Sequence, residues 1–336
     1  MRLVGLLLAT SLACSACRSK ALAPDPLSSP GVAPAQATPT VRAGKGNGEL
    51  RFVAVGDTGK GGKGQLDVAH AIDAHCKQYG CDFVLLLGDN FYETGVSSVE
   101  DSLFRTRFEE PYAALSMPFY AVLGNHDYGA NGAGLDFWRA TFQVQYTSRS
   151  TKWRMPAEYY HFEKPVGTAA LSAQFIGLDT QMILLGRAAV QRTDTSAWIR
   201  QSTAKWKIAF GHHPYISNGP HGNAGEYNGI PLFGNTVKRF FDETICGKVD
   251  FYFAGHDHTL QYLDGGCAGT SFFVSGAGSA PTHNTTKNRT FYQSAELGFL
   301  YGVLLDDELS VSAVDASSKI NYSRTYRKQQ QEQQHE

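Results

Sequence analysis

Five short motifs in this 336-residue chain combine aspartate, asparagine, tyrosine and histidine, the side chains that bind metal ions or move protons. In chain order they are Gly56-Asp57-Thr58-Gly59, Gly88-Asp89-Asn90-Phe91-Tyr92, Gly124-Asn125-His126-Asp127, Gly211-His212-His213-Pro214 and Gly255-His256-Asp257-His258. Carboxylate and amide oxygens suit hard cations, and imidazole nitrogens suit iron, zinc and manganese. Two ions about 3.5–4 Å apart can share one carboxylate and stabilise both the attacking and the leaving oxygen of a phosphoryl displacement. The set therefore predicts a two-metal site suited to phosphate chemistry.

The position of these motifs is stronger evidence than their composition. A Gly-Asp pair after a strand is, by itself, usually a turn with a capping aspartate. Here every motif closes an apolar run whose length and Val, Phe and Leu content are typical of strands buried on both faces. The runs cover residues 51–57, 82–89, 118–125, 206–213 and 250–257. Because ligands bind at the carboxyl ends of strands in open α/β sheets, the five motifs are expected to meet at one edge.

The elements between these runs predict the fold class. Residues 65–79 and 99–115 have helical periodicity, and alternation of strand and helix predicts an α/β sheet with crossover helices. Further strands are expected at 171–179, 271–275, 300–306 and 309–314, with the closely spaced later ones antiparallel. With 42% hydrophobic residues, the chain can form one large globular domain, or at most two.

The five motifs together resemble the calcineurin-like metallophosphoesterase superfamily and, within it, the small purple acid phosphatases of the tartrate-resistant type. The first motif of the wider superfamily reads Asp-x-His, and that histidine binds a metal; here Gly59 occupies its position. Tyr92 in Gly-Asp-Asn-Phe-Tyr follows the purple acid phosphatase pattern instead. The resemblance runs from about Arg51 to Arg327. It implies an α/β fold in which a sandwich of two mixed β-sheets is flanked by helices.

The resemblance also implies the metals and the reaction. A first ion, Fe(III), would be bound by Asp57, Tyr92 and His258, and a second ion, Fe(II), zinc or manganese, by Asn125, His212 and His256, with Asp89 bridging the two. A tyrosinate bound to Fe(III) gives a visible charge-transfer colour. Hydroxide formed on the metals would attack the phosphorus of a small phosphate monoester, so the implied activity is that of a dinuclear-metal acid phosphatase.

Two histidines outside the ligand set are candidate catalytic residues. The resemblance implies that His126 contacts the phosphate or the leaving group, and that His221, nine residues after His212, binds substrate or donates a proton. A solvated histidine in a flexible loop is the competing interpretation of His221. The glycine-rich segment 59–64 lacks the spacing and the final Lys-Ser/Thr of a P-loop, and is interpreted as a loop over the site. Asp127 and Asp257 are expected to support ligands or turns rather than to bind metal.

Charge limits the partners, and two other function classes stay open. Thirty basic and thirty-one acidic residues give a formal net charge of −1, which offers no basic stripe for nucleic acid. The expected partner is a small phosphate ester, bound by a monomer. A phosphodiesterase or nucleotide hydrolase could use the same scaffold. From another class, a non-catalytic metal-binding or redox protein is the alternative, although all seven implied ligands are present.

The N-terminal region predicts export. Residues 1–18 combine Arg2, a ten-residue apolar run too short to span a bilayer, and small residues, as signal peptides do. Cys14 and Cys17 lie where a bacterial lipoprotein signal places its acylated cysteine, so a cleaved leader and a lipid anchor at a membrane both stay open. Residues 19–48, rich in Ala and Pro, are expected to be a disordered tether, 49–327 the folded domain, and 328–336 a disordered tail. The protein would be periplasmic, secreted or lipid-anchored at the cell envelope.

Four further cysteines allow three disulfide pairings in an exported protein. The favoured pairs are Cys246 with Cys267, which bracket one strand-and-loop segment, and Cys76 with Cys81.

Overall fold

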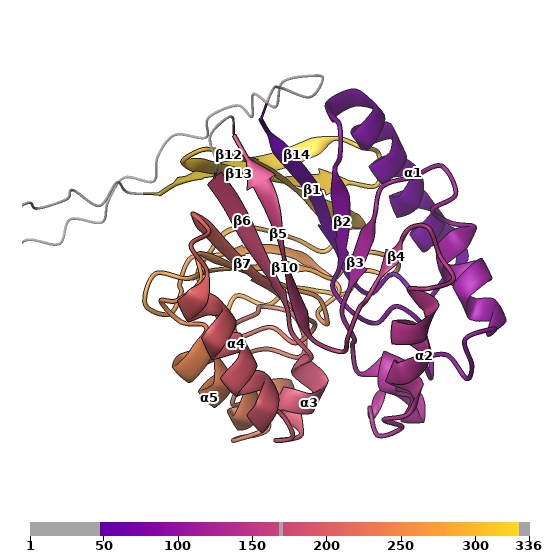
Figure 1. Cartoon of the computed structure of the whole chain (residues 1–336), viewed down its shortest axis with the longest axis horizontal. Coiled ribbons are helices and arrows are strands. Elements are labelled where there is room, and N and C mark those ends of the chain that lie inside the picture. Colours follow the sequence, from indigo (N-terminus) through magenta and orange to yellow (C-terminus); the bar gives the residue numbers. More distant parts are fainter. Residues whose placement is uncertain (1–47, 168–170, 329–336) are drawn as a thin grey trace, which may run out of the picture. The chain divides into compact units, whose positions relative to one another are not determined.

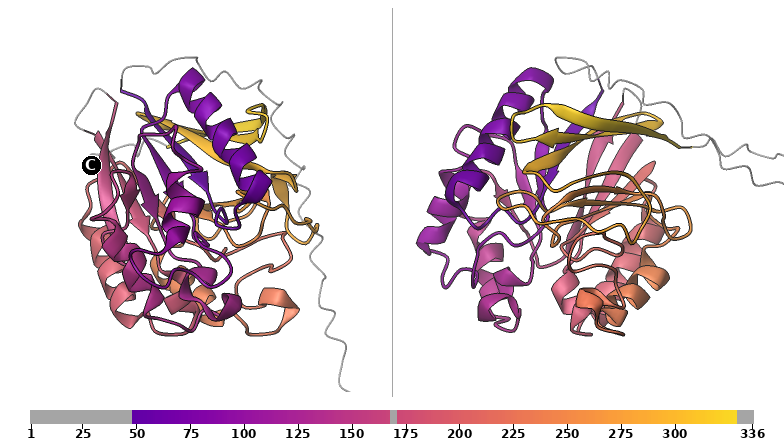
Figure 2. Two further views of the ribbon diagram at one scale, coloured as in Figure 1. Left: turned by 90° about the vertical axis from the view of Figure 1, so that its right-hand side faces the viewer. Right: turned by 180° about the vertical axis from the view of Figure 1, so that it is seen from behind.

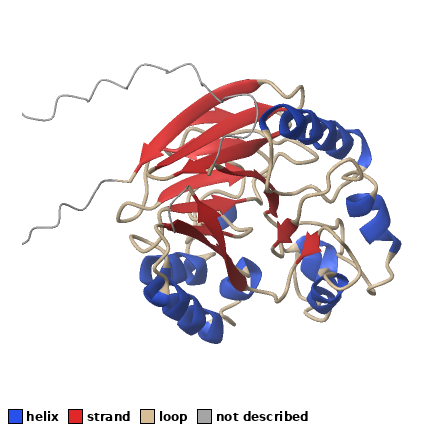
Figure 3. Ribbon diagram, turned by 45° about the horizontal axis from the view of Figure 1, so that its top comes forward, coloured by secondary structure: helices blue, strands red, loops and turns tan. Residues whose placement is uncertain are grey.

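The structure is a computed structural model that describes residues 48–167 and 171–328, so the predicted leader, nearly all of the tether and the tail beyond residue 328 lie outside the described residues. Two seven-stranded sheets pack face to face, and helices lie on their outer sides (Figures 1 and 3). Both sheets contain parallel and antiparallel pairs. The predicted fold class is therefore confirmed.

The first sheet combines a parallel half with an antiparallel half. β1 pairs in parallel with β2, β2 with β3 and β3 with β4, whereas β12, β13 and β14 add an antiparallel meander beside β1. In spatial order its strands are β14 (Ile320–Arg327), β13 (Glu308–Asp315), β12 (Gly298–Leu305), β1 (Leu50–Val55), β2 (Phe83–Leu86), β3 (Phe119–Ala121) and β4 (Trp153–Arg154).

The second sheet has a parallel centre and antiparallel edges. β6, β7, β8 and β10 run in parallel, β5 pairs antiparallel with β6, and β9 lies antiparallel between β10 and β11. In spatial order its strands are β11 (Thr290–Ser294), β9 (Leu260–Leu263), β10 (Ser271–Ser275), β8 (Phe251–Ala254), β7 (Trp206–Phe210), β6 (Leu171–Gly177) and β5 (Tyr160–Val166).

The helices cover the outer faces of the sandwich, as the views from the side and from behind show (Figure 2). α1 and α2 flank the first sheet, and α3, α4 and α5 flank the second (Figure 1). None of the helices between residues 48 and 328, where the structure describes the chain, has the length and apolar character needed to cross a membrane. The helices are α1 (Gly62–Tyr79), α2 (Arg139–Tyr146), α3 (Thr180–Leu184), α4 (Ala189–Gln201) and α5 (Asn235–Thr244), with short helical turns η1 (Phe104–Glu109), η2 (His126–Tyr128), η3 (Ala130–Gly132) and η4 (Tyr227–Gly229).

Aromatic side chains fill the space between the sheets and fix their relative position. The ring of Phe52 on β1 lies 5.7 Å from that of Phe175 on β6 and 5.8 Å from that of Phe253 on β8. All six residues of β1 and all four of β2 and of β8 are buried, as expected for strands covered on both faces. The predicted buried runs are thus confirmed as strands.

Two predictions about elements were wrong in detail. Only residues 102–109 of the predicted helix 99–115 are helical, and 104–109 form a π-helix. Its buried residues Phe104 and Phe108 are four residues apart, and this spacing in the sequence is compatible with both an α-helix and a π-helix. The strand 271–275 pairs in parallel with β8 on one side and antiparallel with β9 on the other, because the chain inserts β9 after β8. β12 and β13 are antiparallel as expected.

Both favoured disulfides are present. Cys76 at the end of α1 pairs with Cys81, with Cα atoms 5.1 Å apart, and Cys246 pairs with Cys267, with Cα atoms 5.0 Å apart.

Candidate metal centre

The carboxyl ends of five parallel strands bring the motifs together. Asp57, Asp89 and Asn125 follow β1, β2 and β3 of the first sheet, and His212 and His256 follow β7 and β8 of the second. The backbone N–H of His256 donates to Asp57 Oδ2 at 2.8 Å and so joins the loop after β8 to the loop after β1. The site therefore lies where the edges of the two sheets meet.

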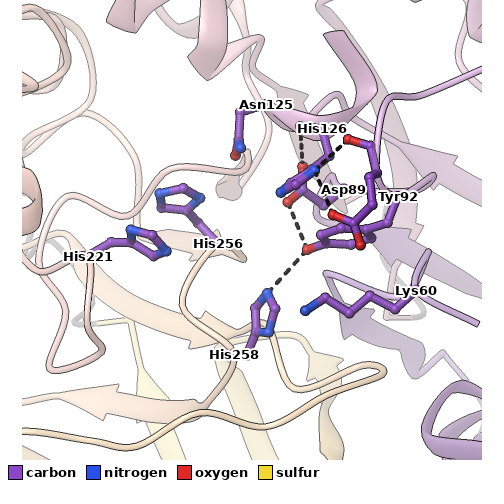
Figure 4. Close-up of a pocket in the computed structure, with 9 residues that line it drawn as sticks. Lys60, Asp89, Tyr92, Asn125, His126, His221, His256 and His258 are labelled. Atoms are coloured by element: carbon purple, nitrogen blue, oxygen red, sulfur yellow. Dashed lines mark hydrogen bonds and ion pairs between the residues drawn. The ribbon is translucent and has the colours of Figure 1, made fainter. Parts of the chain in front are cut away.

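The side chains of Asp57, Tyr92 and His258 lie together on one side of Asp89. The hydroxyl oxygen of Tyr92 lies 3.1 Å from Asp57 Oδ1, 2.8 Å from Asp89 Oδ2 and 3.2 Å from His258 Nε2. His258 Nε2 is also 3.4 Å from Asp57 Oδ1. We call this group the tyrosine cluster; Figure 4 shows Tyr92 and His258 facing each other within it.

A second group, the histidine cluster, lies on the other side of Asp89. His212 Nε2 is 2.9 Å from Asn125 Oδ1, 3.0 Å from His256 Nδ1 and 3.5 Å from Asp89 Oδ2. The other ring nitrogen of His212, Nδ1, lies 2.9 Å from the carbonyl oxygen of Leu87. When Nδ1 carries the proton and donates it to this carbonyl, the lone pair of Nε2 faces the cluster. Asp89 is thus common to both clusters.

The spacing of these donor atoms fits metal coordination. Ligand atoms bound about 2.1 Å from an ion at right angles are roughly 3 Å apart, which is the range found in both clusters. Donor atoms of Asp57, Asp89 and His212 all lie within 4.8 Å of one another. Two buried carboxylates and a phenol oxygen this close are unfavourable unless a cation compensates their charge. The donor set is therefore suited to two ions.

Three of the seven predicted ligands have a left-handed backbone. The φ angles of Asp57, Asp89 and His256 are 58°, 53° and 69°. A non-glycine residue held in this region costs about 1–3 kcal/mol, and such residues cluster at functional sites. Three loops of the candidate site thus share a left-handed residue at the position of a predicted ligand.

The backbone around Gly59 explains why position 59 has no side chain. A Cβ atom on Gly59 would lie 2.2 Å from the carbonyl oxygen of Asn90. The two loops are tied by the N–H of Gly59, which donates to the carbonyl of Asp89, and by the N–H of Tyr92, which donates to the carbonyl of Gly59. No side chain can occupy position 59 in this arrangement, and the Tyr92 hydroxyl reaches the tyrosine cluster from the second loop.

Burial and charge set the protonation of the candidate ligands. Burial, reinforced by the carboxylates of Asp57 and Asp89, raises the pKa of Tyr92 well above its usual value. Burial also lowers the pKa of His256 well below its usual value, and neighbouring histidines lower it further. Burial opposes protonation of His212, but Asp89 and Asp57 raise its pKa overall. A neutral imidazole is the form that binds a metal, whereas Tyr92 needs a strong positive charge nearby to ionise.

His126 and His221 both lie on the wall of the pocket above the clusters. His126 Nδ1 is 2.8 Å from the carbonyl oxygen of Glu93, and its ring lies 4.2 Å from that of Tyr92. The ring of His221 stacks 4.0 Å from that of His256, and its Nδ1 is 2.7 Å from Asn228 Oδ1. A ring contact with His256 and a hydrogen bond with Asn228 therefore hold His221 at the pocket.

Asp127 holds two motif loops in place without reaching the clusters. Its carboxylate accepts hydrogen bonds from the backbone N–H groups of Asn90, Phe91 and Gly124 at 2.8–3.1 Å, and from Gln143 Nε2 at 2.9 Å. Burial, followed by the nearby charge of Asp89, raises its pKa to about 6. The expectation of a supporting role agrees with these contacts.

Asp257 plays the same part on the opposite side of the site. It accepts from the backbone N–H of His221 at 2.9 Å and from Ser217 Oγ at 2.5 Å, so it fixes the loop that carries His221. His213 is buried, and its Nδ1 lies 2.9 Å from Thr180 Oγ1, which leaves it in the wall behind His256.

A pocket of about 220 Å³ opens over the clusters. Two of its residues, Lys60 and Glu93, were not identified from the sequence. For Lys60, the glycine-rich segment 59–64 that contains it could have indicated a position near the site. The pocket is lined by Lys60, Asp89, Tyr92, Glu93, Asn125, His126, His221, His256 and His258 (Figure 4).

Known proteins share this fold and sequence pattern. The calcineurin-like phosphoesterase family matches residues 50–260. Tartrate-resistant acid phosphatase type 5 of Sus scrofa is 31% identical over 307 residues, which cover 80% of this chain and 84% of that protein. Purple acid phosphatase 3 of Arabidopsis thaliana is 29% identical over 273 residues, which cover 76% of this chain and 70% of that protein.

A solved structure extends the comparison to the whole fold. GAP50, the anchor in the inner membrane complex of Plasmodium, aligns with a TM-score of 0.70 at 22% identity, covering 84% of this chain and 90% of that one. At this identity the likeness shows the fold alone. The family match and the acid phosphatase relatives go further: the chain belongs to the calcineurin-like phosphoesterases, resembles the tartrate-resistant purple acid phosphatases, and is a metal-dependent hydrolase of phosphoric ester bonds.

Proposed function

We propose that this protein is a dinuclear-metal acid phosphatase that hydrolyses small phosphate monoesters. The observation that carries the proposal is the division of seven donor side chains into two clusters that share Asp89. When bound, the two metals would lower the pKa of water enough to supply the nucleophile at acid to neutral pH. The tyrosine cluster comprises Asp57, Tyr92 and His258, and the histidine cluster comprises Asn125, His212 and His256.

The metal of the tyrosine cluster is proposed to be Fe(III). Burial and two carboxylates oppose ionisation of Tyr92, so the ion beside it must strongly favour the phenolate. A trivalent cation does this better than a divalent one. The histidine cluster, with one amide oxygen and two imidazoles, is suited to Fe(II), zinc or manganese.

His126 and His221 are proposed to act on the substrate. The carbonyl of Glu93 fixes one nitrogen of the His126 ring, which leaves the other for a phosphoryl oxygen or the leaving group. Asn228 fixes His221 in the same way beside His256. A histidine on each side of the bound ester can stabilise negative charge or deliver a proton to the departing oxygen.

Export of the protein is part of the proposal. The two disulfides are typical of oxidising compartments, where exported proteins fold. Mass spectrometry of the N-terminus of protein from its native host would separate a cleaved leader from a lipid-modified Cys14 or Cys17.

The test is metal content, visible absorption and turnover of the purified protein between pH 4 and 8. We expect two metals per chain, a violet band and hydrolysis of p-nitrophenyl phosphate on the acid side. Faster turnover of bis(p-nitrophenyl) phosphate than of the monoester would favour the phosphodiesterase alternative. Folded protein that binds two metals without turning over either ester would instead support a non-catalytic or redox role.

A further inference from the structure

Lys60 is a cation at the substrate pocket that the proposed mechanism does not use. It lies in the loop between β1 and α1, its side chain is exposed, and its Nζ lies 5.2 Å from the centre of the Tyr92 ring. Figure 4 shows Lys60 beside the tyrosine cluster and His221 at the opposite end of the pocket. The ammonium group is thus at the rim on the Tyr92 side.

The loop that carries Lys60 is held in position by its neighbours. Gly61 has a φ of 72°, and a Cβ atom placed there would overlap the guanidinium of Arg107. Gly59, on the other side of Lys60, is bonded to the Asp89 carbonyl. A backbone fixed on both sides keeps the Cα atom of Lys60 at the pocket rim.

Lys60 shares the pocket with the carboxylates of Asp89 and Glu93 but is not paired with either. Glu93, the other charged residue of the pocket rim, has its Oε2 3.8 Å from His126 Nδ1. Lys63, in the first turn of α1, pairs with Asp67 at 2.6 Å and does not line the pocket. Within residues 48–167 and 171–328, no carboxylate forms an ion pair with Lys60. Its ammonium is available to an anion entering the pocket.

We propose that Lys60 is a specificity-determining residue that selects phosphate monoesters whose leaving group carries a second anion, a carboxylate or another phosphate. The inference rests on the proposed phosphatase function. The phosphoryl group must reach Asp89 and the clusters in the pocket floor, which leaves the exposed rim for the rest of the ester. A second anion at the rim gains a charge-assisted hydrogen bond from Lys60, and an uncharged leaving group does not.

The matched substrates are 2-phosphoglycerate and glycerol 2-phosphate, which differ by a carboxylate in place of a hydroxymethyl group. The measurement is the ratio of their kcat/KM values for the full chain and for Lys60→Gln. An ion pair at this exposed position contributes up to about 1 kcal/mol, so the ratio should fall roughly two- to fivefold in Lys60→Gln. Lys63→Gln, a change of a highly exposed lysine three residues away in the first turn of α1, should leave the ratio unchanged.

A binding measurement gives the same comparison without turnover. Calorimetric affinity for phosphonoacetate relative to methylphosphonate should fall in Lys60→Gln and not in Lys63→Gln, with metal content and melting temperature checked in each variant. An unchanged ratio in Lys60→Gln, or an equal fall in both variants, would overturn the role of Lys60. If the unmodified protein hydrolyses neither ester, the proposed function itself fails; if it hydrolyses both and Lys60 does not affect the ratio, only this inference fails.

Discussion

His75 makes the stability of this protein sensitive to acid. The imidazole lies on α1, is fully buried, and packs against aromatic rings of α1 and β12: those of Tyr79 and Tyr301 at 4.5 Å and that of Phe299 at 5.7 Å. Burial is the main cause that lowers its pKa from 6.5 to about 4; the backbone of Ser318 opposes the shift, and the positive charge of Arg51 adds to it. Protonation at acid pH therefore requires a charge inside the core, or opening of the helix.

The size of the effect follows from the two pKa values. The folded pKa lies below the unfolded one, so the unfolded chain binds the proton more tightly. The contribution of a neutral His75 to stability is complete above pH 6.5 and is lost as the pH falls toward 4. A difference of about 2.5 pKa units corresponds to about 3 kcal/mol of unfolding free energy, a large share of the stability of a typical domain.

The perturbation is His75→Phe, which keeps an aromatic ring of similar size in the same pocket. The free energy of unfolding is measured with urea at pH 7.5 and 4.5, with the disulfides intact and the metals removed. Under these conditions the metal ligands contribute equally to the pH dependence of both proteins. The unmodified protein should lose about 2–3 kcal/mol more than His75→Phe between the two pH values. His70→Gln, an exposed change on the same helix, is the control. Equal losses in the unmodified protein and in His75→Phe would refute the reasoning.

Three further changes test the site. Tyr92→Phe should remove the visible band while iron stays bound by the other ligands; retention of the colour would mean that the tyrosine cluster does not hold Fe(III) through the phenolate. His126→Ala should lower kcat roughly 100-fold or more with both metals retained, because a proton donor or phosphate contact is lost, whereas loss of metal would assign His126 a structural role. Gly59→His should not restore the superfamily ligand but should lower the melting temperature and displace Tyr92, because any Cβ there collides with Asn90; an active, equally stable variant would contradict this.

The sequence predicts most of the buried strands, misses edge strands whose residues are partly exposed, and also misses the buried β9. β1, β2 and β8 are continuous apolar segments, and their recognition needs only composition and length. β14 and β5 are edge strands with partly exposed residues, and β5 contains Pro165, so neither has the pattern of a buried strand. Their pairing depends on neighbours that are distant in sequence.

Five candidate ligands were identifiable because parallel strands deliver their carboxyl ends to the same edge, whereas Tyr92 and His258 were assigned from the family resemblance. No comparable rule places Lys60 or Glu93. They line the pocket because two loops follow particular paths, and those paths depend on contacts such as that between Gly61 and Arg107. Asp127 was recognisable as a supporting residue, yet its four bonded partners come from three separate segments and could not be named from the sequence.

The absence of a histidine at position 59 and the presence of Tyr92 are a single structural feature. The loops after β1 and β2 approach so closely that the backbone of Asn90 occupies the space of any side chain at position 59. The same approach gives Gly59 its hydrogen bonds to both Asp89 and Tyr92, and it brings the tyrosine hydroxyl within 3.1 Å of Asp57. A histidine at position 59 would hold the loops apart, and a tyrosine from the second loop would then fall short of the cluster. Gly59 and Tyr92 are therefore not independent pieces of evidence, because both follow from the close approach of the loops after β1 and β2.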